Sequence, residues 1–190
     1  MRRATRRERG LALLALAAVA AAAAAAETPP EDPRVARGRY LATVMDCGGC
    51  HTPGALAGRR DGGRPLAGSE VGFGGSAPMG AMTGGVVFPS NLTPDPDTGL
   101  GRWSEAEIVR ALRQGVRPDG RALVPVMPWP SYAQLTDEDA FAIAAYLKSL
   151  PAVRHAVPAN VPPGGRSPAP YLRLVRDGDG APPGAAPAAP

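Results

Sequence analysis

Apolar residues recur at helical spacing in three short segments of the chain, and each segment predicts a helix. The first segment follows Asp32, which suits an N-cap, and Pro33, which suits the first helical position. Its apolar face extends to Met45, just before a pair of cysteines. Gly38 lies inside this segment, where a glycine costs about 1 kcal/mol relative to alanine. We therefore expect another backbone or a ring to pack closely against Gly38.

The second and third segments carry clear start signals. Residues 105–114 are preceded by Ser104, which can form a capping box with Glu107. The third segment begins at Thr136, has three acidic residues in a first turn that favours negative charge, and ends before Pro151. Three short helices joined by long connections are the expected architecture.

Two regions lack any sustained period. The stretch between His51 and Trp103 is rich in glycine and proline, and a structureless loop of that length ordinarily argues against a compact domain. A bulky apolar cofactor would resolve this difficulty by organising the loop around itself. After Ala152 the chain becomes rich in proline, alanine and glycine again, and we expect residues 158–190 to form a flexible tail.

The N-terminus reads as an export signal. Five arginines fall within the first nine residues, an apolar run occupies residues 11–26, and the chain then turns abruptly polar. We expect residues 1–26 to be a signal peptide; an uncleaved anchor is the alternative, although 16 apolar residues are fewer than the roughly 20 of a spanning helix. This segment holds five of the 21 basic and one of the 17 acidic residues, so the rest carries 16 of each. Without net charge, neither nucleic acid nor a membrane surface is an expected partner.

Both cysteines of the chain lie in the motif CGGCH, formed by Cys47, two glycines, Cys50 and His51. In an exported protein this spacing is typical of c-type haem attachment, in which the thiols bind the two vinyl groups and the histidine ligates iron. A structural zinc site needs four ligands, and His155 is the only obvious fourth candidate. A redox dithiol usually follows a strand, whereas this motif follows a helical segment. Zinc, a redox dithiol and a plain disulfide are the less favoured alternatives.

A haem iron in such a site needs a second axial ligand, and the chain offers several. Met127 lies in VPVMPWPSY, where three prolines stiffen an extended loop before the third helix. Met45 comes one turn before the cysteines and is out of reach on their side of the ring, while Met79 and Met82 lie in a glycine-rich loop. We expect Met127 to be the distal ligand, and the alternatives are the loop methionines, His155 or an open position.

The residues CGGCHTPG, followed by FPSNLTPDPDTGLGRWSEAEIVRALRQGVRPDGRALVPVMPWPSYAQLTDEDAFAIAAYLKSLPAV, resemble monohaem class I cytochromes c. The likeness is greatest to the cytochrome subunits of alcohol, gluconate and aldehyde dehydrogenases and covers about 33–153. It implies an all-α class I cytochrome c fold over residues 32–157, with few short helices and long loops around one covalently bound haem c. It also implies that His51 and Met127 are the axial iron ligands, and it makes Asn91 a candidate hydrogen-bond donor near a haem propionate.

The expected function is electron transfer in the bacterial periplasm, by a carrier rather than an enzyme. Ligation by histidine and methionine fills both axial positions and favours ferrous iron. The partners would be an exported dehydrogenase as donor and another cytochrome or a terminal oxidase as acceptor. Two alternatives are a haem enzyme or gas sensor with an open sixth position, and an accessory subunit whose tail wraps around one dehydrogenase.

Overall fold

The computed structural model describes residues 30–75 and 85–173. The chain divides into two units, residues 1–32 and 33–190, and all helices and strands below belong to the second. The expected signal peptide, Met79 and Met82 lie outside the described residues. In the part of the chain that the structure describes, no helix has the length and apolar character needed to cross a membrane.

The three predicted helices are all present, together with shorter ones. The helical elements are α2 (Pro33–Val44), α3 (Cys47–His51), η1 (Ala55–Ala57), α4 (Glu105–Gln114), α5 (Trp129–Tyr132) and α6 (Asp137–Ser149). The capping box of α4 is confirmed, because the Glu107 amide donates to Ser104 Oγ and the Ser104 amide donates to the Glu107 carboxylate. At the start of α6, the Thr136 hydroxyl accepts a hydrogen bond of 3.1 Å from the Asp139 amide.

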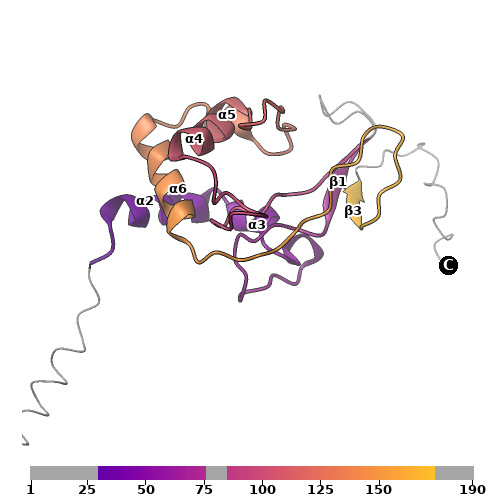
Figure 1. The fold of residues 1–190 in the computed structure, drawn as a ribbon, viewed down its shortest axis with the longest axis horizontal. Helices are drawn as coiled ribbons and strands as arrows, with labels where there is room; N and C mark the ends of the chain where they lie inside the picture. The colour runs from indigo at the N-terminus through magenta and orange to yellow at the C-terminus, as the bar shows by residue number, and fades with distance from the viewer. Residues whose placement is uncertain (1–29, 76–84, 174–190) are drawn as a thin grey trace, which may run out of the picture. The chain divides into compact units, whose positions relative to one another are not determined.

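The core lies where α2, α4 and α6 meet (Figure 1). Its central residue is Ile143, of which 1% is exposed. Buried apolar side chains from the three helices and from two loops surround Ile143: Leu41, Leu66, Leu100, Ile108, Leu112, Ala144 and Leu147. Gly38 of α2 faces the backbone of α6 so closely that a Cβ there would overlap the Ala142 carbonyl group and meet Tyr146 Cβ at 2.8 Å. The close approach expected at Gly38 is therefore confirmed.

We predict that Gly38→Ala lowers the free energy of unfolding by about 1–3 kcal/mol, because the added methyl group forces α2 and α6 apart. This cost exceeds the gain in helix propensity of about 1 kcal/mol. Chemical denaturation of the haem-loaded protein measures it. Gly62→Ala is the matched control, since a Cβ at Gly62 meets nothing within 4 Å. Equal stability of the two variants would contradict the prediction.

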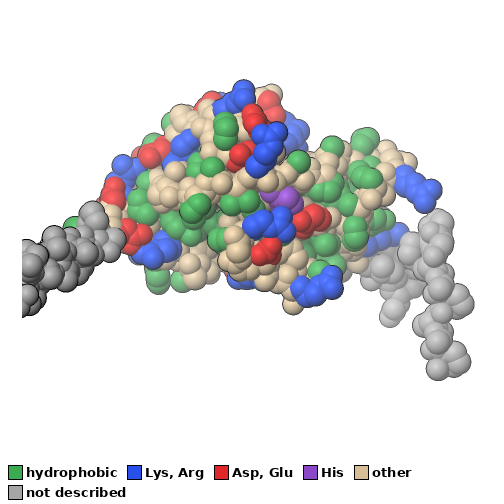
Figure 2. Space-filling model, turned by 60° about the horizontal axis from the view of Figure 1, so that its bottom comes forward, with side chains coloured by type: hydrophobic (Ala, Val, Ile, Leu, Met, Phe, Trp, Pro, Cys, Tyr) green, Lys and Arg blue, Asp and Glu red, His purple; other side chains and the backbone are tan. Residues whose placement is uncertain are grey.

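Exposed ion pairs add further links between the helices. Arg37 of α2 forms a bidentate pair with Asp139 of α6 at 2.9 and 3.1 Å, and Arg34 pairs with Glu105 at the start of α4 at 2.7 Å. Positive and negative side chains are interspersed over the face shown in Figure 2. Because each pair is largely exposed, each contributes at most about 1 kcal/mol.

A small sheet adds to the helical fold expected from the sequence. Its strands are β1 (Gly72–Gly74), β2 (Val86–Val87) and β3 (Tyr171–Arg173), in the order β2-β1-β3. β1 pairs antiparallel with β2 and parallel with β3. Residues 158–173, which we expected to be part of a flexible tail, therefore include a strand. β1 and β2 are too short to produce an alternating pattern. β3 lies at the start of YLRLVR, Tyr171 to Arg176, an alternating apolar stretch that was expected to belong to the tail.

The long loop between β2 and α4 is organised by hydrogen bonds rather than by regular structure. The Asp95 carboxylate accepts hydrogen bonds from the Thr98 amide and hydroxyl, both at 2.7 Å. The ammonium group of Lys148, near the end of α6, donates to the carbonyls of Gly101 and Trp103, both at 2.9 Å. The loop is thus attached to the end of α6, and the residues within it are held against the core.

Candidate cofactor site

A cavity of about 410 Å³ lies beside α3 and is lined mainly by apolar side chains. Its volume falls within the range of small-molecule and cofactor sites. Cys47, Cys50, His51 and Met127 all line this cavity, so the fold brings together four residues that span 80 positions of the sequence. The remaining wall includes core residues of α4 and α6: Ile108, Ala111, Leu112, Ile143 and Leu147.

The short helix α3 holds both thiols at the cavity. It begins after Asp46, whose backbone is left-handed with φ 51°. A Cβ at Gly49 would overlap the Asp46 carboxylate, so a larger residue there would require this exposed side chain to move. Both cysteines are free thiols, and burial raises the pKa of Cys47 to about 11 and also raises that of Cys50. Both groups are therefore protonated at neutral pH.

His51 is fixed in orientation and in tautomer. Its Nδ1 lies 2.7 Å from the Ser90 carbonyl oxygen, which can only accept, so Nδ1 carries the proton. Burial lowers the pKa of His51, partly opposed by this hydrogen bond. The ring is thus neutral at neutral pH, and the lone pair of Nε2 is free for a metal ion.

Met127 lies in a turn that is restrained on both sides. Its amide donates to the Val124 carbonyl at 3.1 Å, and its carbonyl accepts from the Trp129 amide at 2.7 Å. The indole of Trp129 donates in turn to the Leu123 carbonyl at 3.2 Å. We expected an extended loop here; the structure instead has a turn that leads into α5, with Pro128 directly before the helix. The backbone of Met127 is held by these hydrogen bonds as well as by the neighbouring prolines.

This donor set has the chemistry that a c-type haem requires. Two thiols lie within one five-residue helix, a neutral imidazole has a free nitrogen, and a thioether lines the same apolar cavity. A family model described as cytochrome c matches residues 35–151, which is more than half of the chain. The chain belongs to the cytochrome c family.

Several curated proteins are similar to this cytochrome c domain. A nicotinate dehydrogenase subunit of Pseudomonas putida is 40% identical over 124 residues, which are 65% of this chain and 9% of that protein. The fructose dehydrogenase cytochrome subunit of Gluconobacter japonicus is 41% identical over 115 residues, 60% of this chain and 21% of that subunit. The gluconate 2-dehydrogenase cytochrome c subunit of Pantoea cypripedii is 41% identical over 115 residues, 60% and 23% of the two chains. The matched part thus spans less than a quarter of each relative.

Membership of the cytochrome c family confirms the resemblance and the fold class that the sequence predicted. A cytochrome c domain binds haem c covalently and carries electrons, and the relatives named as cytochrome subunits are electron-carrying rather than catalytic components.

Asn91 and His155 lie elsewhere in the cytochrome c domain. Asn91, of which 1% is exposed, donates to the Val153 carbonyl at 2.8 Å and accepts from the Thr93 amide at 2.9 Å. Asn91 itself is not part of the cavity lining, although its neighbours Ser90 and Leu92 are, and its role near a haem propionate stays a prediction. His155 contacts the Ala67 carbonyl at 2.6 Å and Glu70 at 2.9 Å through its two ring nitrogens, also away from the cavity.

Asn91→Ala is predicted to lower the free energy of unfolding by about 2–3 kcal/mol, because it leaves buried hydrogen-bonding groups of the loop unpaired. Haem attachment and the visible spectrum should stay unchanged. Thermal unfolding followed by circular dichroism tests the first part, and the absorption spectrum tests the second. A changed spectrum at unchanged stability would indicate that Asn91 contacts the cofactor after all.

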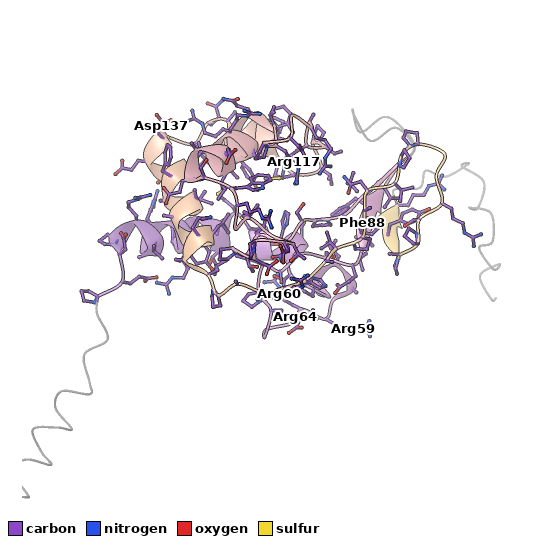
Figure 3. All side chains as sticks on the ribbon, viewed as in Figure 1. Arg59, Arg60, Arg64, Phe88, Arg117 and Asp137 are labelled. Atoms are coloured by element: carbon purple, nitrogen blue, oxygen red, sulfur yellow. The ribbon has the colours of Figure 1, made fainter. Side chains whose placement is uncertain are left out.

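Two groups of cavity residues were not predicted from the sequence. Arg117 and Arg121 line the otherwise apolar cavity, and the Arg117 guanidinium lies 4.9 Å from the centre of the Trp103 ring. Phe88 lines it from the side of the sheet, and Figure 3 shows Phe88 near β1 and Arg117 near α5. Basic residues among the loop glycines and prolines gave no periodic signal, and only the fold shows which of them reach the cavity.

Met45 also lines the cavity, next to the cysteine motif. It lies in the turn between α2 and α3. Among the described residues, no group of three or more histidine, cysteine, aspartate or glutamate side chains is placed to hold a metal ion. His155, the fourth ligand that the zinc alternative needs, does not line the cavity of the cysteines.

Proposed function

We propose that this cytochrome c domain is a periplasmic electron carrier with one haem, attached to Cys47 and Cys50 and ligated by His51 and Met127. The observation that carries the proposal is that all four side chains line one cavity. Bound haem supplies a single iron that cycles between the ferric and ferrous states. The thioether of Met127 favours the ferrous state. The apolar wall excludes water, which would otherwise stabilise the more highly charged ferric state.

Two features support the proposed ligand roles. The Ser90 carbonyl orients the His51 ring and holds its proton on Nδ1, which strengthens Nε2 as a ligand. The turn around Met127 is hydrogen-bonded on both sides, so its thioether is pre-positioned. With both axial positions filled, the domain has no open site for oxygen or substrate, which suits a carrier.

The location and partners are part of the same proposal. The order of charged and apolar residues in 1–26 supports export to the periplasm. In this proposal, a haem domain occupies residues 32–157 and a tail occupies residues 158–190. The single CXXCH motif supports one haem. The names of the relatives support a dehydrogenase as electron donor. In the periplasm this donor would be an exported enzyme, and another cytochrome or a terminal oxidase would be the acceptor. Contacts with these partners are expected to be small and transient.

Absorption spectra of protein expressed with export and haem attachment test this function. The oxidised form should show the weak far-red band of sulfur ligation to ferric haem, and carbon monoxide should leave the reduced spectrum unchanged. If the band is absent and carbon monoxide binds at once, the sixth position is open. The chain would then be a haem enzyme or gas sensor rather than a carrier.

A further inference from the structure

The segment 158–173, which we name the C-terminal strap, is bonded to one wall of the cavity. Asn160 Oδ1 accepts a hydrogen bond of 3.0 Å from the Phe88 amide. Val161 and Val86 exchange two backbone hydrogen bonds of 2.9 and 2.8 Å. Farther along the strap, the Pro170 carbonyl accepts from the Gly72 amide at 2.9 Å, and β3 continues this pairing along β1. The strap thus contacts both β1 and β2.

Glycines let the strap approach closely. A Cβ at Gly85 would lie 2.5 Å from the Val161 carbonyl oxygen, and a Cβ at Gly74 would lie 2.5 Å from the Tyr171 ring. Real Cβ atoms essentially never show contacts this short. Gly85 faces backbone and therefore requires a residue without a side chain, whereas a Cβ at Gly74 would force the exposed Tyr171 ring to move.

The wall that the strap holds belongs to the haem cavity. Phe73 of β1, Val87 of β2 and the buried Phe88 line the cavity, as does Asn160 of the strap itself. Two residues after Phe88, the Ser90 carbonyl accepts the hydrogen bond from His51. The backbone from Phe88 to Ser90 therefore connects the hydrogen bond to Asn160 with the hydrogen bond that orients His51, the proposed iron ligand.

We propose that the C-terminal strap keeps this wall closed against water and thereby raises the reduction potential of the haem, with Asn160 as a positioning residue. The physical reason is that water near the iron stabilises the more highly charged ferric state, so its exclusion favours the ferrous state. The inference rests on the proposed haem site. It assigns a function to a segment that the sequence analysis treated as a tail.

Asn160→Ala removes the side-chain acceptor of the Phe88 amide and leaves the backbone bonds of Val161 in place. In the full-length, haem-loaded protein, we expect hydrogen exchange of the Phe88 amide to become about fivefold faster, as for the loss of one ordinary hydrogen bond. At the wild-type midpoint potential, the ratio of ferric to ferrous protein should rise at least about threefold. Gln114→Ala, which removes an exposed amide from the end of α4, is the matched control and should change neither quantity.

Two truncations distinguish the contribution of β3 from that of Asn160. Deletion of residues 166–190 removes β3 and the Pro170 acceptor but keeps Asn160 and Val161; deletion of 174–190 leaves all described residues in place. We expect only the longer deletion to speed exchange at the Gly72 amide and to lower the potential. If the longer deletion does not fold, Asn160→Ala decides alone.

The two readouts together decide whether the strap acts in this way. Faster exchange together with a lower potential supports it. A lower potential without faster exchange would overturn it, because Asn160 would then act by direct contact with the haem. Faster exchange without a change in potential, or no change in either, would also overturn it. Wild-type protein without the far-red band would instead refute the proposed His51 and Met127 ligation, which the spectrum reports before any variant is compared.

Discussion

The double variant Cys47→Ser, Cys50→Ser is expected to lose covalent haem completely. The two thiols are the only cysteines of the chain and lie together on α3 beside the cavity, so no other residue can replace the thioether bonds. Haem staining after denaturing electrophoresis and the intact mass of the purified chain measure the loss. Each single variant should keep one thioether and thus the mass of haem, but at lower yield.

The double variant is also expected to be unstable. Without haem, water enters the cavity of about 410 Å³, and the apolar side chains that line it lose their burial. Protease resistance of the double variant, compared with the haem-loaded wild type, tests this expectation. A haem-free variant as resistant as wild type would contradict the idea that the cofactor organises the long loop.

The sequence predicted those parts of the domain that depend on local signals. The capping box of α4 and the acidic first turn of α6 are contained within a few residues each, and both helices begin where expected. The close contact at Gly38 was also predictable, because a glycine inside a helix needs a reason. The motif CGGCH indicated its chemistry because all its chemical groups are adjacent.

The parts that the sequence did not predict depend on long-range contacts. Asn160 meets Phe88 across 72 positions, and β3 meets β1 across 99 positions, from Gly72 to Tyr171. The amide of Asn91 likewise connects a loop to the distant Val153 carbonyl. In each case the partner is a backbone group, which carries no trace of the pairing in the sequence.

Met127→Ala is expected to leave haem attached and to lower the reduction potential by on the order of 100 mV, because the thioether no longer favours ferrous iron. At 59 mV for each factor of ten, this corresponds to more than a tenfold shift toward the ferric form. The far-red band should disappear, and the reduced protein should bind carbon monoxide at the opened position. Redox titration and absorption spectra of the purified variant measure these changes.

Met45→Ala is the matched control, since it removes the same side chain from the lining of the same cavity. Met45 lies just before the cysteines, and we expect it on their side of the ring, so its loss should change packing but keep the far-red band and the carbon monoxide resistance. If Met45→Ala loses the band and Met127→Ala keeps it, the distal ligand has been assigned to the wrong methionine. If both variants keep it, the sulfur ligand lies outside the described residues, where Met79 and Met82 are the remaining candidates.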